Sequence, residues 1–175
     1  IQLNPLSSLA SISSTGRKVG ELNLSVVGEH NLLNALAAFT AASALNMAED
    51  KLFTGLKSFT GTRRRFELKG EVSGIKVIDD YGHHPTEIIA TLTAAKNLAQ
   101  SARVLVIFQP HRYSRTAAFF EQFSAALSNA DFTFLLEVYA ASEKAIPGVS
   151  SLMIARNMDQ AKVKFEPSML EVVSE

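Results

Sequence analysis

The chain has 175 residues and no cysteine, and its 17 Lys and Arg residues balance its 17 Asp and Glu residues. The lack of cysteine excludes disulfides and thiolate metal sites, and the zero net charge argues against a dedicated nucleic-acid binder. Hydrophobic residues make up 47% of the chain, which indicates a packed core. No apolar run reaches the roughly 20 residues of a membrane helix. We therefore expect neither nucleic acid nor a membrane as a partner.

The first part of the chain predicts a hairpin followed by two helices. Apolar residues alternate between Val19 and Val26, and Thr15 and Gly16 before them are typical of a hairpin turn. After Gly28 the apolar spacing becomes that of an alanine-rich helix of roughly 16 residues. The stretch AEDKLFTGLKSF indicates a second, shorter helix.

A second pattern starts where FTGTRRRFE interrupts the first, so we predict two domains, 1–62 and 63–175. A turn at Ser73 and Gly74 would join the strands RFELKGEV and IKVIDD. The helix PTEIIATLTAAKNLAQ, the strand ARVLVIF, the helix TAAFFEQFSAALSN, the strand ADFTFLLEV and a weaker strand SSLMIA follow. This alternation predicts an α/β fold with a mostly parallel sheet and helices on both faces, in which VLVIF and FTFLL are buried on both sides.

Ligands of open parallel sheets bind beyond the C-terminal ends of the strands. This rule selects three polar loops: DDYGHHPTE, QPHRYSRT and EVYAASEK. Three of the four histidines of the chain lie in these loops, and His30 lies in GEHNLLN. Imidazole can donate, accept or carry a proton near neutral pH, although a single histidine can equally serve as a helix cap.

Two groups of arginines suggest anion binding. Arg112 and Arg115 lie three apart at the predicted start of a helix, where the N-terminus already favours anions. Guanidinium groups add bidentate hydrogen bonds to carboxylate or phosphate, so this turn is a candidate anion pocket; a solvated basic turn is the alternative. Arg63, Arg64 and Arg65 form the only basic run, at the predicted boundary, where a nucleotide often lies between domains.

The start of the first predicted helix carries polar side chains. Asn31 and Asn34 share a helix face, and a carboxamide matches the donor and acceptor edge of adenine. Helix capping explains one such residue, but not both of them together with His30. Neither GxxxxGK[ST] nor GxGxxG is present, so a loop for the phosphates of ATP would have to lie on another segment.

A metal site at Asp80, His83 and His84 is a further alternative. Adjacent residues point apart, however, and nothing resembles HExxH. We therefore predict no metal ligands in this chain.

Four motifs in register, GEHNLLNALAA, FTGTRRRFE, DDYGHHPTEI and FQPHRYSRT, resemble the Mur ligase family over residues 26–149. The resemblance implies a Rossmann-like C-terminal domain, preceded by a strand and helix remnant of a central ATPase domain. It further implies a cytoplasmic enzyme of peptidoglycan synthesis, and thus of cell-wall biogenesis, cell shape and cell division. In the branch of the family that these motifs resemble most, ATP phosphorylates the carboxylate of UDP-N-acetylmuramate. The amine of L-alanine then attacks the acyl phosphate, and phosphate leaves.

The resemblance also implies what this chain lacks. The phosphate loop and the Mg²⁺ ligands would lie upstream, in the rest of the parent ligase acting in cis. We therefore expect the chain by itself to be inactive.

Roles for individual residues follow from the same resemblance. The positions that match the nucleotide site, with Asn31 and Asn34 facing adenine and Asp80 on the ribose hydroxyls, are His30, Asn31, Asn34, Arg65 and Asp80. Tyr81 and Arg112 match substrate-binding positions. The catalytic positions are His83, His111 and Arg115, and His111 has either a proton-transfer or an orienting role.

Two other functions remain open. A sister ligase recycles a murein tripeptide onto the same sugar, but its third-strand loop usually lacks HRYSR, so the intact HRYSRT favours L-alanine. A noncatalytic nucleotide- or RNA-binding module is the second, which the zero net charge and the lack of interleaved aromatics disfavour.

Overall fold

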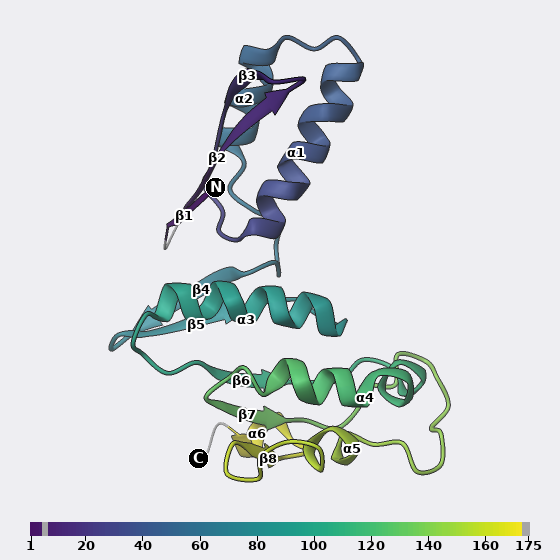
Figure 1. Ribbon diagram of the computed structural model, residues 1–175. Helices are drawn as coiled ribbons and strands as arrows, with labels where there is room; N and C mark the ends of the chain where they lie inside the picture. Colours follow the sequence, from purple (N-terminus) through teal and green to yellow (C-terminus); the bar gives the residue numbers. More distant parts are fainter. Residues whose placement is uncertain (5–6, 173–175) are drawn as a thin grey trace. The chain divides into compact units, whose positions relative to one another are not determined.

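The computed structural model describes residues 1–4 and 7–172. The chain divides into two compact units, with the boundary between Tyr81 and Gly82. Each unit has its own hydrophobic core. Figure 1 shows the helices and strands of both units. Within the described ranges, no helix is both long enough and apolar enough to cross a membrane.

The first unit begins with an antiparallel sheet covered by two helices. Its elements are β1 (Gln2–Asn4), β2 (Ser7–Ser14), β3 (Arg17–Leu24), α1 (Glu29–Ala44) and α2 (Glu49–Ser58), and the strand order is β1-β2-β3. Leu22 and Leu24 of β3 pack with Leu32 and Phe39 of α1 and with Leu52 of α2. The predicted hairpin and both predicted helices are confirmed.

A second hairpin, β4 (Glu67–Val72) and β5 (Ile75–Asp79), completes the first unit. Ser73 and Gly74 have φ angles of 52° and 81°, which suits a tight two-residue turn between twisted strands. The predicted turn is therefore confirmed. Among the described residues β5 pairs with β4 alone, so its predicted place in the parallel sheet stays a prediction, as do the domain limits.

The second unit is an α/β layer structure. Its elements are α3 (Pro85–Ala99), β6 (Leu105–Phe108), α4 (Tyr113–Leu127), β7 (Phe132–Leu135), α5 (Leu152–Ala155), β8 (Val163–Phe165) and α6 (Met169–Val172). The three strands are parallel, in the order β6-β7-β8. The predicted α/β class with a parallel sheet is confirmed.

The core of this unit lies between the sheet and α3, α4 and α5. Phe123 of α4, Leu135 of β7 and Ile154 of α5 are completely buried. Leu105 and Ile107 of β6 are 56% and 49% exposed, because successive side chains of a strand point to opposite faces. The prediction that VLVIF is buried on both sides is therefore wrong, and the helical core covers one face of β6.

The last four residues of the stretch SSLMIA form α5, so the prediction of a strand there is wrong. Ser151 is buried together with Ile154 and Ala155, which lie three and four residues further on, and this is helical spacing. Ser124 of α4 fixes the short helix by donating its hydroxyl to the Ile154 carbonyl at 2.9 Å. The third strand of the sheet is instead β8, which the sequence did not indicate.

Candidate functional site

The start of α1 places His30 against a glycine. Gly28 has a φ of 103°, and a Cβ atom there would lie 2.6 Å from Cε1 of His30. Burial lowers the pKa of His30 and Arg65 lowers it further, whereas Asp80 raises it. The charges of Arg65 and Asp80, two predicted nucleotide-site residues of the same unit, thus act on the His30 imidazole in opposite directions.

The two asparagines of α1 differ in their surroundings. Nδ2 of Asn31 donates to the Val27 carbonyl at 2.8 Å, so one of its donors is used within the chain. Asn34, one turn further along, is exposed. One donor of the Asn31 carboxamide is thus used locally, whereas the Asn34 carboxamide has no hydrogen-bond partner among the described residues.

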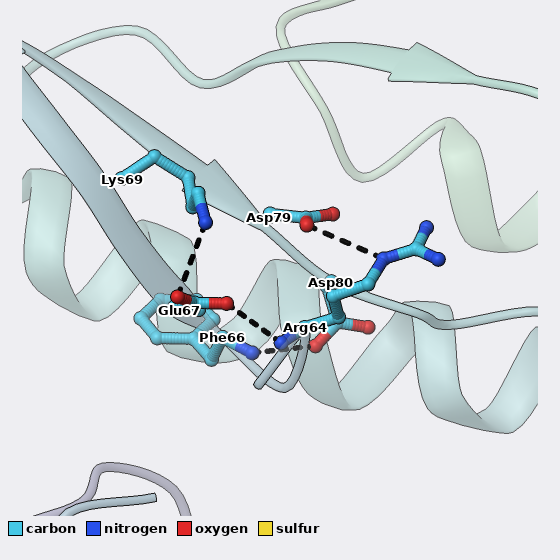
Figure 2. A network of polar contacts seen from close by, with 6 residues as sticks. All are labelled: Arg64, Phe66, Glu67, Lys69, Asp79 and Asp80. Carbon is cyan, nitrogen blue, oxygen red and sulfur yellow. Dashed lines mark hydrogen bonds and ion pairs between the residues drawn. The ribbon is translucent and has the colours of Figure 1, made fainter. Parts of the chain in front are cut away.

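The basic run continues into a polar network, which Figure 2 shows. The Asp80 carboxylate accepts the Phe66 amide at 2.8 Å, and the Glu67 carboxylate accepts the Arg64 amide at 2.8 Å. Nε of Arg64 lies 3.3 Å from the carboxylate of Asp79. Arg64 and Phe66 have φ angles of 56° and 49°, so this turn holds two left-handed residues other than glycine.

Tyr81 contacts the arginines of this turn. The guanidinium carbons of Arg64 and Arg65 are 4.9 and 6.0 Å from its ring centroid, and its amide donates to the Arg64 carbonyl at 2.7 Å. The basic run is therefore more than a solvated face, because the structure ties Arg64 to an acid and an aromatic ring.

In the second unit, one carboxylate organises the loop before α3. Oε2 of Glu87 accepts the amides of His83 and His84 at 2.9 and 3.2 Å, and it lies 3.4 Å from Nδ1 of His83. Nδ1 of His84 accepts the Thr86 amide at 3.4 Å, and Pro85 occupies the first helical position. This is a complete capping box with a proline start.

His84 is a structural residue. Its ring meets Phe119 edge-on, with centroids 5.0 Å apart, at the one residue of α4 whose backbone is not helical. Across the described chain, no three His, Asp or Glu side chains gather in a way that could hold a metal ion. The alternative of a metal site at Asp80, His83 and His84 thus gains no support.

The loop after β6 runs beside the loop after β7. The Tyr139 amide donates to the Pro110 carbonyl at 2.8 Å, and the Arg112 amide donates to the Tyr139 carbonyl at 2.8 Å. His111 and Tyr139 form a parallel bridge beyond the ends of the strands. Two of the three polar loops that the sequence selected are therefore side by side.

His111 sits between two aromatic rings, with His83 at 6.4 Å and Tyr139 at 5.5 Å between centroids. Its Nδ1 is buried and has no hydrogen-bond partner among the described residues. Burial, aided by the positive charges of Arg115 and Arg112 and by His83, lowers the pKa of His111 below its usual value. The neutral imidazole is thus favoured near neutral pH.

The two arginines of this loop have different partners. Nη1 of Arg112 lies 3.8 Å from the carboxylate of Glu143, whereas Nη1 of Arg115 donates to the His111 carbonyl at 3.4 Å. No carboxylate of the described chain pairs with Arg115. Sequence reasoning missed Glu143, although it selected the loop EVYAASEK that carries it.

Residues 64–175 match the family described as Mur ligase, glutamate ligase domain. The chain therefore belongs to the Mur ligase family. A curated relative from Renibacterium salmoninarum, named UDP-N-acetylmuramate–L-alanine ligase, is 50% identical over 154 residues, which cover 88% of this chain and 33% of the relative. The chain thus spans about a third of the length of such relatives.

Two solved structures resemble this chain. The UDP-N-acetylmuramate–alanine ligase of Thermotoga maritima superposes with a TM-score of 0.81 at 30% identity, over 98% of this chain and 37% of that one. A murein peptide ligase of Psychrobacter arcticus superposes with a TM-score of 0.66 at 25% identity, over 99% of this chain and 36% of that one.

Proposed function

We propose that this chain is the C-terminal part of an ATP-dependent ligase that joins L-alanine to UDP-N-acetylmuramate in peptidoglycan synthesis. Family membership supports a ligase, and the names of the relatives support the two substrates. We place the enzyme in the cytoplasm, the compartment that contains both ATP and the nucleotide sugar. By itself the chain would be inactive, because the loop that binds the phosphates would lie in the remainder of the parent ligase.

The observation that carries this proposal is a neutral histidine, His111, beside Arg115 at the start of α4, an arginine that meets no carboxylate among the described residues. The Arg115 guanidinium would orient the carboxylate of the amino acid or stabilise the transferring phosphoryl group. The attacking amine must lose a proton, and the neutral His111 imidazole would either accept that proton or orient the amine by a hydrogen bond. His83, whose ring is 6.4 Å from that of His111, would complete the catalytic set, and Tyr81 would contact substrate.

The first unit would hold the nucleotide. His30, Arg65 and Asp80 are gathered there, and Asp80 suits a ribose hydroxyl because its carboxylate is fixed by the Phe66 amide. Asn31 and Asn34 would face adenine. Bound ATP supplies the phosphoryl group that activates the sugar carboxylate. We place the Mg²⁺ ligands in the upstream part of the parent ligase.

The test follows phosphate release from ATP by the full-length protein that carries this sequence, with UDP-N-acetylmuramate and either L-alanine or the murein tripeptide. We expect release that depends on L-alanine. Release only with the tripeptide would assign the recycling reaction. If neither substrate causes phosphate release and the protein binds RNA in a way that weakens steeply with salt, the noncatalytic module would be favoured.

Arg115→Ala probes the proposed site. We expect kcat/KM for L-alanine to fall at least about 100-fold, as when one preorganised donor of a charged transition state is removed. The matched control is Arg156→Ala, which removes an exposed arginine of the same unit at the end of α5. Equal activity of the two variants would contradict the role of Arg115.

A further inference from the structure

A strained turn aims Glu143 at the start of α4. Ala141 and Ser142 have φ angles of 49° and 71°, and the Glu143 amide donates to the Ala140 carbonyl at 3.0 Å. Two consecutive left-handed residues other than glycine persist only where the surrounding structure determines them. We therefore attribute the left-handed backbone of Ala141 and Ser142 to the contacts that Glu143 makes.

Glu143 closes the first turn of α4 from 29 residues away. Its two carboxylate oxygens accept the Ser114 amide at 3.0 Å and the Ser114 hydroxyl at 2.6 Å. The same carboxylate lies 3.8 Å from Nη1 of Arg112, the residue before the helix. The hydroxyl and amide of Ser114, aided by Arg112 and the Tyr113 amide, hold the pKa of Glu143 below its usual value. The carboxylate is thus ionised at neutral pH.

Arg112 cannot cap the helix with its own side chain, and its φ angle is 79°. Its amide is bonded to the Tyr139 carbonyl and its guanidinium is paired with Glu143, so both of its ends are fixed by the neighbouring loop. Arg115, one turn along the same helix, lacks any such acid within the part of the chain that the structure describes. Of the two cations, therefore, one has a carboxylate partner among the described residues and one does not.

We propose that Glu143 is a positioning residue of the amino-acid site, which binds Arg112 into the scaffold and leaves Arg115 as the one cation that meets the substrate anion. The proposal rests on the proposed function. It revises the expectation that both arginines form a joint anion pocket. A second unpaired cation nearby would offer the carboxylate of the amino acid an alternative, unproductive position, and Glu143 removes that choice.

The experiment compares Glu143→Gln, Arg112→Gln and the double variant in the full-length protein. Glutamine keeps an oxygen that can accept the Ser114 amide, but it removes the charge that holds Arg112. We expect kcat for L-alanine to fall about tenfold in Glu143→Gln without a rise in the KM for L-alanine, because unproductive binding lowers both. The double variant, in which Arg112 no longer supplies a free cation, should regain most of the kcat that Glu143→Gln loses.

The rescue separates positioning from a general structural role. Loss of local structure would raise KM and would become worse, not better, when Arg112 is also changed. Glu166→Gln is the matched control, because Glu166 makes an ion pair of the same 3.8 Å length with Lys164 in the same unit. Thermal unfolding of each variant shows whether it folds. If Glu143→Gln does not fold, Arg112→Gln still tests the proposal.

Two results would overturn the inference: a double variant as impaired as Glu143→Gln, or an Arg112→Gln variant as impaired as Arg115→Ala. The first would mean that Glu143 does not act through Arg112, and the second that Arg112 itself meets the substrate. Wild-type protein that releases no phosphate with L-alanine would instead refute the proposed function, so the two failures are distinguishable.

Discussion

The two helices that border the candidate catalytic loops start in different ways. The start of α3 is closed by its own sequence, since His84, Pro85 and Glu87 supply the cap, the first helical residue and the returning carboxylate. The start of α4 has no side-chain cap of its own and is closed by Glu143, which follows the next strand. One loop is thus fixed locally, and the other depends on the folding of the whole sheet edge.

The two site histidines show the same difference. Nδ1 of His83 lies 3.4 Å from the carboxylate of Glu87, four residues away in sequence. Nδ1 of His111 is buried without a hydrogen-bond partner among the described residues, and Arg115 and Arg112 lower its pKa in addition to burial, whereas Glu143 raises it. A local acid therefore accompanies the first histidine, whereas burial in the folded protein is the main cause that favours the neutral form of the second.

The largest effect in this comparison should come from Glu87→Ala. The change leaves the His83 and His84 amides without their acceptor, and losing a helix cap costs about 1–2 kcal/mol. Urea unfolding of the full-length protein measures the loss. Glu121→Ala is the control, because Glu121 is exposed in the middle of α4. Equal losses for the two variants would show that α3 does not depend on its local cap.

The difference between local and long-range contacts also decides which features the sequence could predict. The start of α3 was predictable, because PTE places a proline and an acid in the first turn, and the turn at Ser73 and Gly74 was predictable from its residue types. Both signals are local. The family resemblance likewise rested on contiguous motifs, and the match over residues 64–175 confirms the family.

What could not be predicted depends on distant contacts. SSLMIA is apolar enough for a strand, but Ile154 packs on α4 and its carbonyl accepts the Ser124 hydroxyl, which selects a helix. The partnership of Glu143 with Ser114 needs two loops to meet beyond the strands, and nothing in EVYAASEK by itself indicates it. The roles of the site residues stay predictions, because the geometry shows where they lie and not what they bind.

A smaller effect should appear in the pH dependence of stability. The pKa of His111 is lower in the folded protein than its unfolded value of about 6.5, so the unfolded state binds the extra proton. The free energy of unfolding should therefore fall as the pH drops below about 6.5, and His111→Gln should remove that part of the slope. Chemical unfolding at a series of pH values measures it.

Arg115→Gln sharpens this test. Burial is the largest cause of the lowered pKa of His111 and Arg115 the next, so this variant should reduce the slope without abolishing it. A slope of the opposite sign, or one that His111→Gln leaves unchanged, would mean that His111 is not held neutral by the fold.

The smallest effect should come from Ser114→Ala, which separates the two bonds that Glu143 makes with one residue. The change removes the 2.6 Å bond from the hydroxyl but keeps the 3.0 Å bond from the amide, and water can reach this exposed position. We expect the thermal midpoint to fall by less than about 4 °C. A loss as large as that of Glu87→Ala would show that the hydroxyl, rather than the backbone of α4, is the main anchor of Glu143. The cap of α4 would then rest on a single side-chain contact, and the contrast with the start of α3 would be stronger.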